Sequence, residues 1–250
     1  MYAASVTCTA FQDVTWLTDP VGSSTDELAV FRVALSDGAD WMPHLHRLLS
    51  PDEIERAARY HRSDDRLRFC GTRGVLRLLL ARCTHQPADR IEFIAGVNRK
   101  PELNSGWHFN VSHAGNWALI AIGKVRVGVD VEWINPDFAF RDVLQASFSP
   151  DEQYYINAHQ DARPSFYQLW TRKEAMVKAT GKGMDDAFAR IPSLAGTHPL
   201  DARLLGQAGH WTVSGFTVAD GYPAAVAHDG TSSLTPRFYT FDRGLITGPG

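Results

Sequence analysis

Four side chains that could bind a metal ion and a phosphate group occur at spacings that would bring them together. Asp130 and Glu132 lie two residues apart in the apolar run V-G-V-D-V-E-W-I, which predicts a strand over residues 127–134. Alternate strand residues point to one face, so both carboxylates should leave it together. Glu174 and Lys178 lie four residues apart in the run W-T-R-K-E-A-M-V-K-A-T-G-K-G, which predicts a helix with both on one face. Three carboxylates and a lysine that converge would suit a hard cation and a phosphate.

The apolar surroundings of these residues favour a metal site. A D-x-E pair alone is usually a solvated strand face. Here the flanking valines and Trp133 indicate a mostly buried strand, where unpaired charges would be costly. Lys173 and Lys178 beside Glu174 would allow exposed ion pairs, but their apolar neighbours indicate that one helix face is buried. Oxygen ligands suit magnesium, which takes further ligands from water and substrate phosphate; manganese and calcium are the alternatives.

A second group of residues suggests phosphate binding. Ser112 and His113 occur in the run N-V-S-H, but adjacent strand residues face opposite ways and no G-x-S-x-G elbow is present. This disfavours a hydrolase triad, and donation to phosphate oxygens fits better. No glycine-rich phosphate loop occurs, so a nucleotide would have to be held by basic side chains and a metal. Seven arginines from Arg56 to Arg77 could supply contacts, although such a cluster is usually a solvated face.

The composition gives no further functional signal. The chain has 250 residues, enough for one large domain or two small ones, and a formal charge of -3 that argues against nucleic acid or an anionic membrane as a partner. Its three cysteines lack C-x-x-C spacing and predict reduced, buried thiols. No secretory signal and no apolar run of membrane-spanning length is present, so we expect a cytoplasmic protein.

Caps and apolar periodicity predict the elements that position these residues. The tetrapeptide S-P-D-E at residues 50–53 and 149–152 combines an N-cap serine, a first-turn proline and a capping-box glutamate. We expect residues 1–26 to be irregular, because they are polar. The other expected elements are a strand over 28–35, helices over 41–49, 50–61 and 64–83, strands over 91–95, 107–111 and 117–123, a helix that ends at Gly181, and short strands in the C-terminal third.

An internal duplication with an offset of 99 residues relates two halves of the chain. It superimposes the two S-P-D-E runs, Thr72-Arg73 on Thr171-Arg172, and the strand over 28–35 on the strand over 127–134. The residues that correspond to the three acids and to Lys178 are apolar: Phe31, Val33, Val75 and Leu79. The sequence therefore predicts an α+β pseudo-dimer of two similar halves, residues 1–125 and 126–250, with one site at their junction. We expect a monomer, because the halves already supply a twofold interface.

The order of N-V-S-H, G-V-D-V-E and W-T-R-K-E-A-M-V-K-A-T-G-K-G resembles the signature of Sfp-type 4′-phosphopantetheinyl transferases. The resemblance runs from about residue 50 to residue 183 and includes the arginine-rich helices and the Lys100-Pro101 turn. The family also implies a pseudo-dimer of two α+β halves. The resemblance implies that Asp130, Glu132 and Glu174 are magnesium ligands, that Lys178 lies near the coenzyme A pyrophosphate, that Ser112 and His113 contact coenzyme A phosphates, that Lys100 and Pro101 form the adenine-side turn, and that Arg56 and Arg68 contact the 3′-phosphate and pyrophosphate.

The resemblance also implies the reaction. A serine hydroxyl of an apo acyl or peptidyl carrier protein would attack the pantetheine-side phosphorus of coenzyme A, giving phosphopantetheinyl-serine and 3′,5′-ADP. Glu174, directly or through a metal-bound water, would be the base, and Lys178 would stabilise charge on the leaving phosphate. Two alternatives use the same residues: a magnesium-dependent phosphohydrolase that acts on a nucleotide, and a carrier-protein-binding module without activity.

Overall fold

The computed structural model describes residues 3–18, 28–36, 41–96, 98, 100–183, 187–230 and 234–247. The described strands form two five-stranded sheets and a small hairpin. The first sheet has the order β2-β12-β3-β7-β6, with β2 at Leu17–Thr18, β12 at Arg237–Thr240, β3 at Ala29–Ala34, β7 at Trp117–Gly123 and β6 at His108–Ala114. The second has the order β8-β11-β10-β1-β9, with β8 at Val127–Val131, β11 at Tyr222–Asp229, β10 at Gly209–Ala219, β1 at Ala3–Ala10 and β9 at Gly196–Asp201. The hairpin pairs β4, Ile94–Ala95, with β5, Pro101–Glu102.

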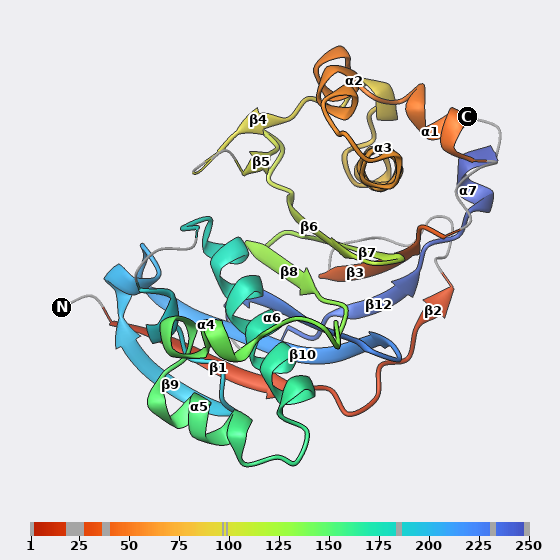
Figure 1. Ribbon diagram of the computed structural model, residues 1–250. Coiled ribbons are helices and arrows are strands. Elements are labelled where there is room, and N and C mark those ends of the chain that lie inside the picture. Colours follow the sequence, from red (N-terminus) through yellow and green to blue (C-terminus); the bar gives the residue numbers. More distant parts are fainter. Residues whose placement is uncertain are drawn as a thin grey trace.

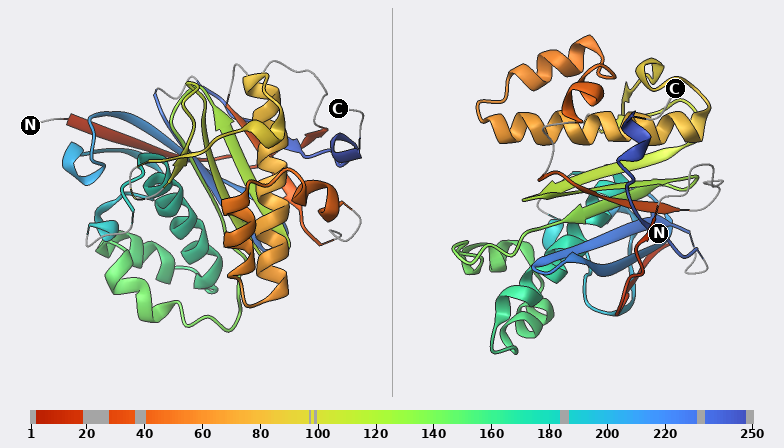
Figure 2. Two further views of the ribbon diagram at one scale, coloured as in Figure 1. Left: turned by 90° about the horizontal axis from the view of Figure 1, so that it is seen from above. Right: turned by 90° about the vertical axis from the view of Figure 1, so that its right-hand side faces the viewer.

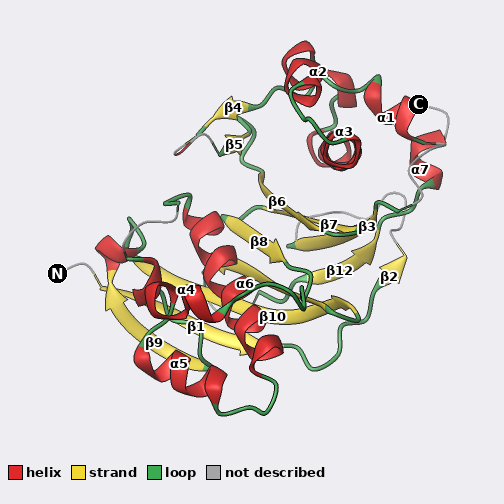
Figure 3. Cartoon of the chain, viewed as in Figure 1, coloured by secondary structure: helices red, strands yellow, loops and turns green. Residues whose placement is uncertain are grey.

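Helices cover the outer face of each sheet (Figures 1 and 3). They are α1 at Met42–His46, α2 at Pro51–Ala58, α3 at Ser63–Thr84, α4 at Arg141–Ser147, α5 at Pro150–Asn157, α6 at Ala162–Thr180 and α7 at Gly244–Thr247. Short 3-10 helices span Ala88–Arg90, Phe188–Arg190 and Ala202–Leu204. The right-hand view of Figure 2 shows the layers as helix, sheet, sheet and helix. The result is the α+β class that the sequence predicts.

Apolar side chains fill all three interfaces between these layers. Leu79 and Leu80 of α3 pack on the first sheet, and Ala175 and Met176 of α6 pack on the second. Between the sheets, residues of β3 and β7 meet those of β8, β10 and β11: Val30, Leu119, Ala121, Val127, Val129, Phe216 and Val226. Because these side chains are nearly inaccessible to water, apolar burial holds the two sheets face to face.

The duplicated helix starts are confirmed. The starts of α2 and α5, and likewise those of α3 and α6, differ by the predicted offset of 99 residues. In α5, Ser149 Oγ accepts from Glu152 N at 3.3 Å and Glu152 Oε2 accepts from Ser149 N at 2.9 Å. In α2, Glu53 Oε2 accepts from Ser50 N at 2.9 Å. The predicted end of α6 at Gly181 is also confirmed, because that glycine has a left-handed φ of 72°.

The prediction of an irregular segment over residues 1–26 is wrong for Ala3–Ala10 and for Leu17–Thr18, and residues 19–26 lie outside the described residues. Ala3–Ala10 forms β1, which runs parallel to β10 and antiparallel to β9. Ala4, Val6 and Cys8 are buried, and the residues between them are less so. This alternation is a strand pattern, and threonines favour strands, although the segment lacks large apolar residues. Two other expected strands are shorter than predicted: 91–95 is reduced to β4, and β8 ends at Val131.

The terminal strands cross between the sheets. β1 lies in the sheet of β8, β10 and β11, whereas β12 pairs in parallel with β3 in the other sheet. The division at residue 125 stays a prediction, and each terminal strand lies in the sheet formed mainly by the other half. This exchange ties the halves together.

All three cysteines lie in the described part of the chain. Cys8, Cys70 and Cys83 are buried, as predicted, and no disulfide joins them. Within the described ranges, none of the helices combines the length and the apolar character needed to cross a membrane.

Candidate active site

The site lies where the edge strands β6 and β8 of the two sheets meet beneath α6. Side chains of β6 join the strands: Asn110 Oδ1 accepts from Val129 N at 2.8 Å, and Ser112 Oγ donates to Asp130 Oδ1 at 2.8 Å. The junction of the halves therefore carries polar groups from both.

Gly128 allows α6 to contact β8 closely. A Cβ atom at this position would lie 2.1 Å from Ala175 O and 2.3 Å from Ala179 N, too close for any side chain. The glycine thus lets helix backbone pack directly on strand backbone. This contact brings the helical residues Glu174 and Lys178 beside Asp130.

Asp130, Lys178 and Ser112 form a closed hydrogen-bonded group. Lys178 Nζ donates to Asp130 Oδ1 at 2.6 Å and to Ser112 Oγ at 3.0 Å. Asp130 is buried, with 2% of its surface exposed. Burial raises the pKa of Asp130, and its hydrogen bonds from Lys178 and Ser112 oppose that rise. The predicted meeting of the D-x-E strand with the helical lysine is therefore present.

Three carboxylates share this region. Burial, reinforced by the Asp130 charge, raises the pKa of Glu132 to about 7. Burial and the Asp130 charge also raise the pKa of Glu174. Glu132 is the residue directly after the end of β8, and Glu174 belongs to α6. Such mutual repulsion is relieved when a cation binds between carboxylates.

The donor set fits a hard cation in part. Among the residues that the structure describes, no group of three or more His, Cys, Asp and Glu side chains is already arranged around a metal position. Asp130 Oδ2 and Glu174 Oε1, however, are buried oxygens without a hydrogen-bond partner. Buried acceptors are rarely left unpaired, and carboxylate oxygens are the ligands that magnesium takes. These two atoms are the best candidates for metal contact.

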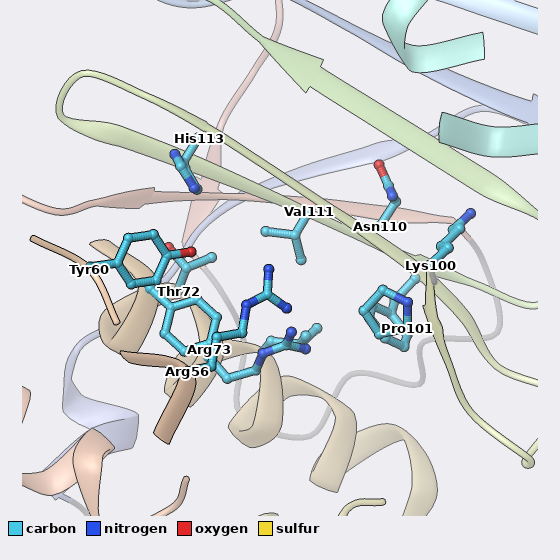
Figure 4. A pocket seen from close by; sticks show the side chains of 12 residues that line it. Arg56, Tyr60, Thr72, Arg73, Lys100, Pro101, Asn110, Val111 and His113 are labelled. Atoms are coloured by element: carbon cyan, nitrogen blue, oxygen red, sulfur yellow. The ribbon is translucent and has the colours of Figure 1, made fainter. Parts of the chain in front are cut away.

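A basic cavity of about 240 Å³ lies beside this group, between β6 and the helices α2 and α3. Figure 4 shows the guanidinium groups of Arg56 and Arg73 inside it, with His113 at the wall. The lining residues are Arg56, Tyr60, Phe69, Thr72, Arg73, Leu76, Lys100, Pro101, Phe109, Asn110, Val111 and His113. Paired guanidinium groups among aromatic walls suit a phosphorylated ring compound.

Ser112 and His113 of β6 face opposite ways, as the alternation of strand residues predicts. His113 lines the cavity, whereas Ser112 points the other way, toward Asp130. Burial, and then the nearby Lys178 and Arg68 charges, lower the pKa of His113. His113 would therefore donate to a ligand as a neutral ring.

Two basic residues have partners of their own. Arg68 is absent from the cavity lining: Nε donates to Gly115 O at 3.0 Å and Nη1 to Asp65 Oδ1 at 2.8 Å. Lys100 lines the cavity, but its Nζ donates to Lys178 O at 2.7 Å and Val127 O at 3.2 Å. Burial lowers the pKa of Lys100 to about 8.

The sequence does not single out Arg73 among the seven arginines of this region. Arg73 lines the cavity while its Nε lies 3.2 Å from Glu53 Oε1, and Arg77 Nε lies 2.8 Å from Glu53 Oε2. Glu53 is buried, so it orients both guanidinium groups. The available signal was the repeated Thr-Arg pair, Thr72-Arg73 and Thr171-Arg172. In the structure both of these arginines are largely buried.

A second groove, of about 390 Å³, also borders His113. It is lined by His113, Ala114, Gly115, Glu132, Trp133, Asn135, Phe138, Phe166, Tyr167 and Trp170. Trp133 and Phe138 are exposed there. His113 thus borders both the basic cavity and an aromatic groove.

Comparison with protein families matches both parts of the chain. The model of the 4′-phosphopantetheinyl transferase superfamily matches residues 126–227. The model described as 4′-phosphopantetheinyl transferase, N-terminal, matches residues 38–124. Together the matched ranges contain every predicted site residue.

Similar proteins carry related names. The 4′-phosphopantetheinyl transferase HetI of Nostoc sp. is 30% identical over 237 residues, which cover 91% of this chain and 98% of HetI. The slr0495 protein of Synechocystis sp., named for the same class, is 36% identical over 60% of this chain and 64% of its own length. The 4′-phosphopantetheinyl transferase Sfp of Bacillus subtilis is 27% identical over 56% of this chain and 65% of Sfp. The chain therefore matches slightly less than two thirds of two relatives and nearly all of the third.

Proposed function

We propose that this chain, which belongs to the 4′-phosphopantetheinyl transferase superfamily, is an enzyme that transfers the phosphopantetheine group of coenzyme A to an apo carrier protein in a magnesium-dependent reaction. The acceptor would be a serine of an acyl or peptidyl carrier protein, and the products would be phosphopantetheinyl-serine and 3′,5′-ADP. The observation that carries this proposal is the group formed by Asp130, Lys178 and Ser112, which is adjacent in the chain to His113, a residue that lines both the basic cavity and the aromatic groove.

The basic cavity would hold the nucleotide end of coenzyme A. Arg56 and Arg73 would pair with phosphate oxygens, since guanidinium groups bind phosphate through two parallel hydrogen bonds. Tyr60, Phe69 and Pro101 supply apolar walls for the base. His113, at the border of the cavity, would donate to a phosphate oxygen nearer the reacting bond.

The reaction forms a bond between the serine oxygen and phosphorus and breaks the bond to the 3′,5′-ADP oxygen. Magnesium, when bound by Asp130, Glu132 and Glu174, would supply Lewis-acid stabilisation of phosphate charge. Lys178 would stabilise the negative charge that grows on the leaving phosphate. Glu174, whose pKa is raised, would accept the serine proton as general base.

The aromatic groove would admit the acceptor. Its lining includes Glu132 and the exposed Trp133 and Phe138, so an apolar protein surface could pack there with its serine toward the carboxylates. The opposite cavity is basic and would be filled by the nucleotide. Donor and acceptor would then approach the reacting group from two sides.

One experiment tests this proposal against both alternatives. The protein is incubated with coenzyme A, magnesium and an apo carrier protein, and intact mass reports the phosphopantetheine adduct. We expect the adduct with wild type, and its loss in chelator and in Glu174→Gln. Glu55→Gln, which alters an exposed ion pair with Arg59, is the matched control and should react normally.

The competing outcomes are distinct. Release of a nucleotide product without an acceptor would identify a phosphohydrolase. Carrier binding without any adduct, unaffected by Glu174→Gln, would identify a binding module. Either result would overturn the proposed transfer.

A further inference from the structure

The turn between β4 and β5 contacts the carboxyl end of α6, although the two segments are far apart in the chain. Asn98 Nδ2 donates to Gly181 O at 2.8 Å and to Lys182 O at 2.6 Å. Lys100 Nζ donates to Lys178 O at 2.7 Å. In Figure 1 the hairpin lies above this end of α6. We call Asn98 and Lys100 the α6 clasp.

The carbonyls that the clasp contacts need outside donors. The last carbonyl groups of a helix have no partner within the helix. The N–H of Gly181 donates to Val177 O at 3.0 Å, which satisfies one of them. The clasp supplies donors for the oxygens of Lys178, Gly181 and Lys182. An amide and an amine from the first half thereby complete the helix end of the second.

The backbone of Asn98 adopts an uncommon conformation. Its φ is 51°, a left-handed value that few residues other than glycine adopt. Asparagine tolerates this region better than most residues, and its amide then reaches both carbonyls. Gly183, with φ of 78°, lies against the same amide: a Cβ there would be 3.4 Å from Asn98 Nδ2. Asn98 and Gly183, the residues on the two sides of this contact, therefore both have left-handed backbones.

The clasp connects the cavity with the reacting group. Lys100 and Pro101 line the basic cavity. Lys178, whose carbonyl accepts from Lys100, sends its own side chain to Asp130 and Ser112. A shift of the helix end would therefore move Lys178 Nζ relative to the carboxylate. Misplacement by about 1 Å can lower a rate by about 100-fold.

We propose that Asn98 is a positioning residue: through the α6 clasp it holds the carboxyl end of α6 where Lys178 contacts Asp130. Through the same clasp, a ligand bound in the basic cavity stabilises that end of α6. The kinetic consequence rests on the proposed function, whereas the structural consequence does not. Asn98 itself touches no reacting atom.

Two variants test the side-chain amide of Asn98 separately from its backbone conformation. Asn98→Gly removes the donor and keeps the left-handed φ accessible, and Asn98→Asp replaces the donor by an acceptor that faces two carbonyls. Asn157→Gly is the matched control, since Asn157 Nδ2 donates to Gln153 O at 2.9 Å near the end of α5, away from the site. Circular dichroism establishes that each variant is folded.

The first measurement is amide hydrogen exchange without any ligand. We expect exchange in peptides covering residues 176–183 to accelerate about 10-fold in both Asn98 variants, because two hydrogen bonds are lost. The Asn157 control should leave this region unchanged. Added coenzyme A should slow exchange there in wild type and much less in Asn98→Gly.

The second measurement is steady-state transfer. We expect kcat to fall about 10- to 100-fold in both Asn98 variants, with KM for coenzyme A within about twofold of wild type. Wild-type exchange over 176–183 in both variants would overturn the clasp. Faster exchange with unchanged kcat would overturn the positioning role of Asn98. Absence of transfer by wild type would instead contradict the proposed function, and the exchange data would still decide whether the clasp holds α6.

Discussion

Lys178 Nζ lies 2.6 Å from Asp130 Oδ1, across the contact between α6 and β8. The carboxylate is almost fully buried, while the lysine side chain is 28% exposed. The pair therefore joins a partly solvated cation to a buried anion at the junction of the two sheets. Breaking such a pair leaves a buried charge, whereas removing both charges does not.

The first prediction separates stability from activity at this pair. Lys178→Met should lower the free energy of unfolding by about 3 kcal/mol, because Asp130 loses its counter-charge. The double variant Asp130→Asn, Lys178→Met should recover much of that loss and remain inactive. Urea unfolding together with the carrier-protein assay measures both. A double variant no more stable than Lys178→Met would contradict the coupling.

The second prediction concerns the contact at Gly128. Gly128→Ala should destabilise the protein by several kcal/mol and reduce transfer, because a Cβ would push α6 away from β8. Thermal unfolding and kcat provide the readouts. Gly71→Ala serves as control: its Cβ would meet the flexible Met42 Cε at 3.2 Å, so we expect a small effect. Equal effects at the two glycines would show that the close approach is unimportant.

The third prediction tests the basic cavity. Arg56→Ala should raise KM for coenzyme A about 10-fold or more, because a phosphate would lose a charged hydrogen-bond donor. The carrier-protein KM should stay nearly unchanged. Arg59→Ala is the control, since Arg59 pairs with Glu55 on the exposed face of α2. A similar change in KM for both variants would point to a general charge effect.

The fourth prediction is a pH dependence of stability. Burial lowers the pKa of His228, which is 1% exposed. The unfolded chain therefore takes up a proton near pH 6.5 before the folded protein does, and stability falls as pH drops below that value. His228→Gln should flatten the slope of unfolding free energy between pH 7 and pH 5, by up to about 1.4 kcal/mol per pH unit. An unchanged slope would exclude His228 as a contributor.

Local signals in the sequence were sufficient for the starts of α2 and α5, for the end of α6 and for the central acids, but they did not predict α4 or α7. The S-P-D-E runs define two helix starts through hydrogen bonds within four residues, and Gly181 ends α6 through its own φ. The spacing of Asp130 and Glu132 matches the strand period, and the spacing of Glu174 and Lys178 matches the helix period. These features depend on neighbours in the chain, so they can be predicted without knowledge of the fold.

Long-range packing decided the remaining features. β1 joins β10 some 200 residues away, which the weakly apolar N-terminal segment does not reveal. Lys173, for which exposed ion pairs were an alternative, is fully buried and lies 2.8 Å from Glu152 of another helix.

The sequence by itself determined the α+β class, the starts of α2 and α5, the end of α6, the duplication and the residues that could bind metal and phosphate. Only the tertiary structure decided that Ser112 contacts Asp130 while His113 faces the cavity. It also decided that Arg73 lines this cavity, whereas Arg68 donates to Gly115 O in the turn between β6 and β7. The reason is physical. Periodicity assigns a side chain to a face of its own element, but the partner of that face depends on how distant elements pack.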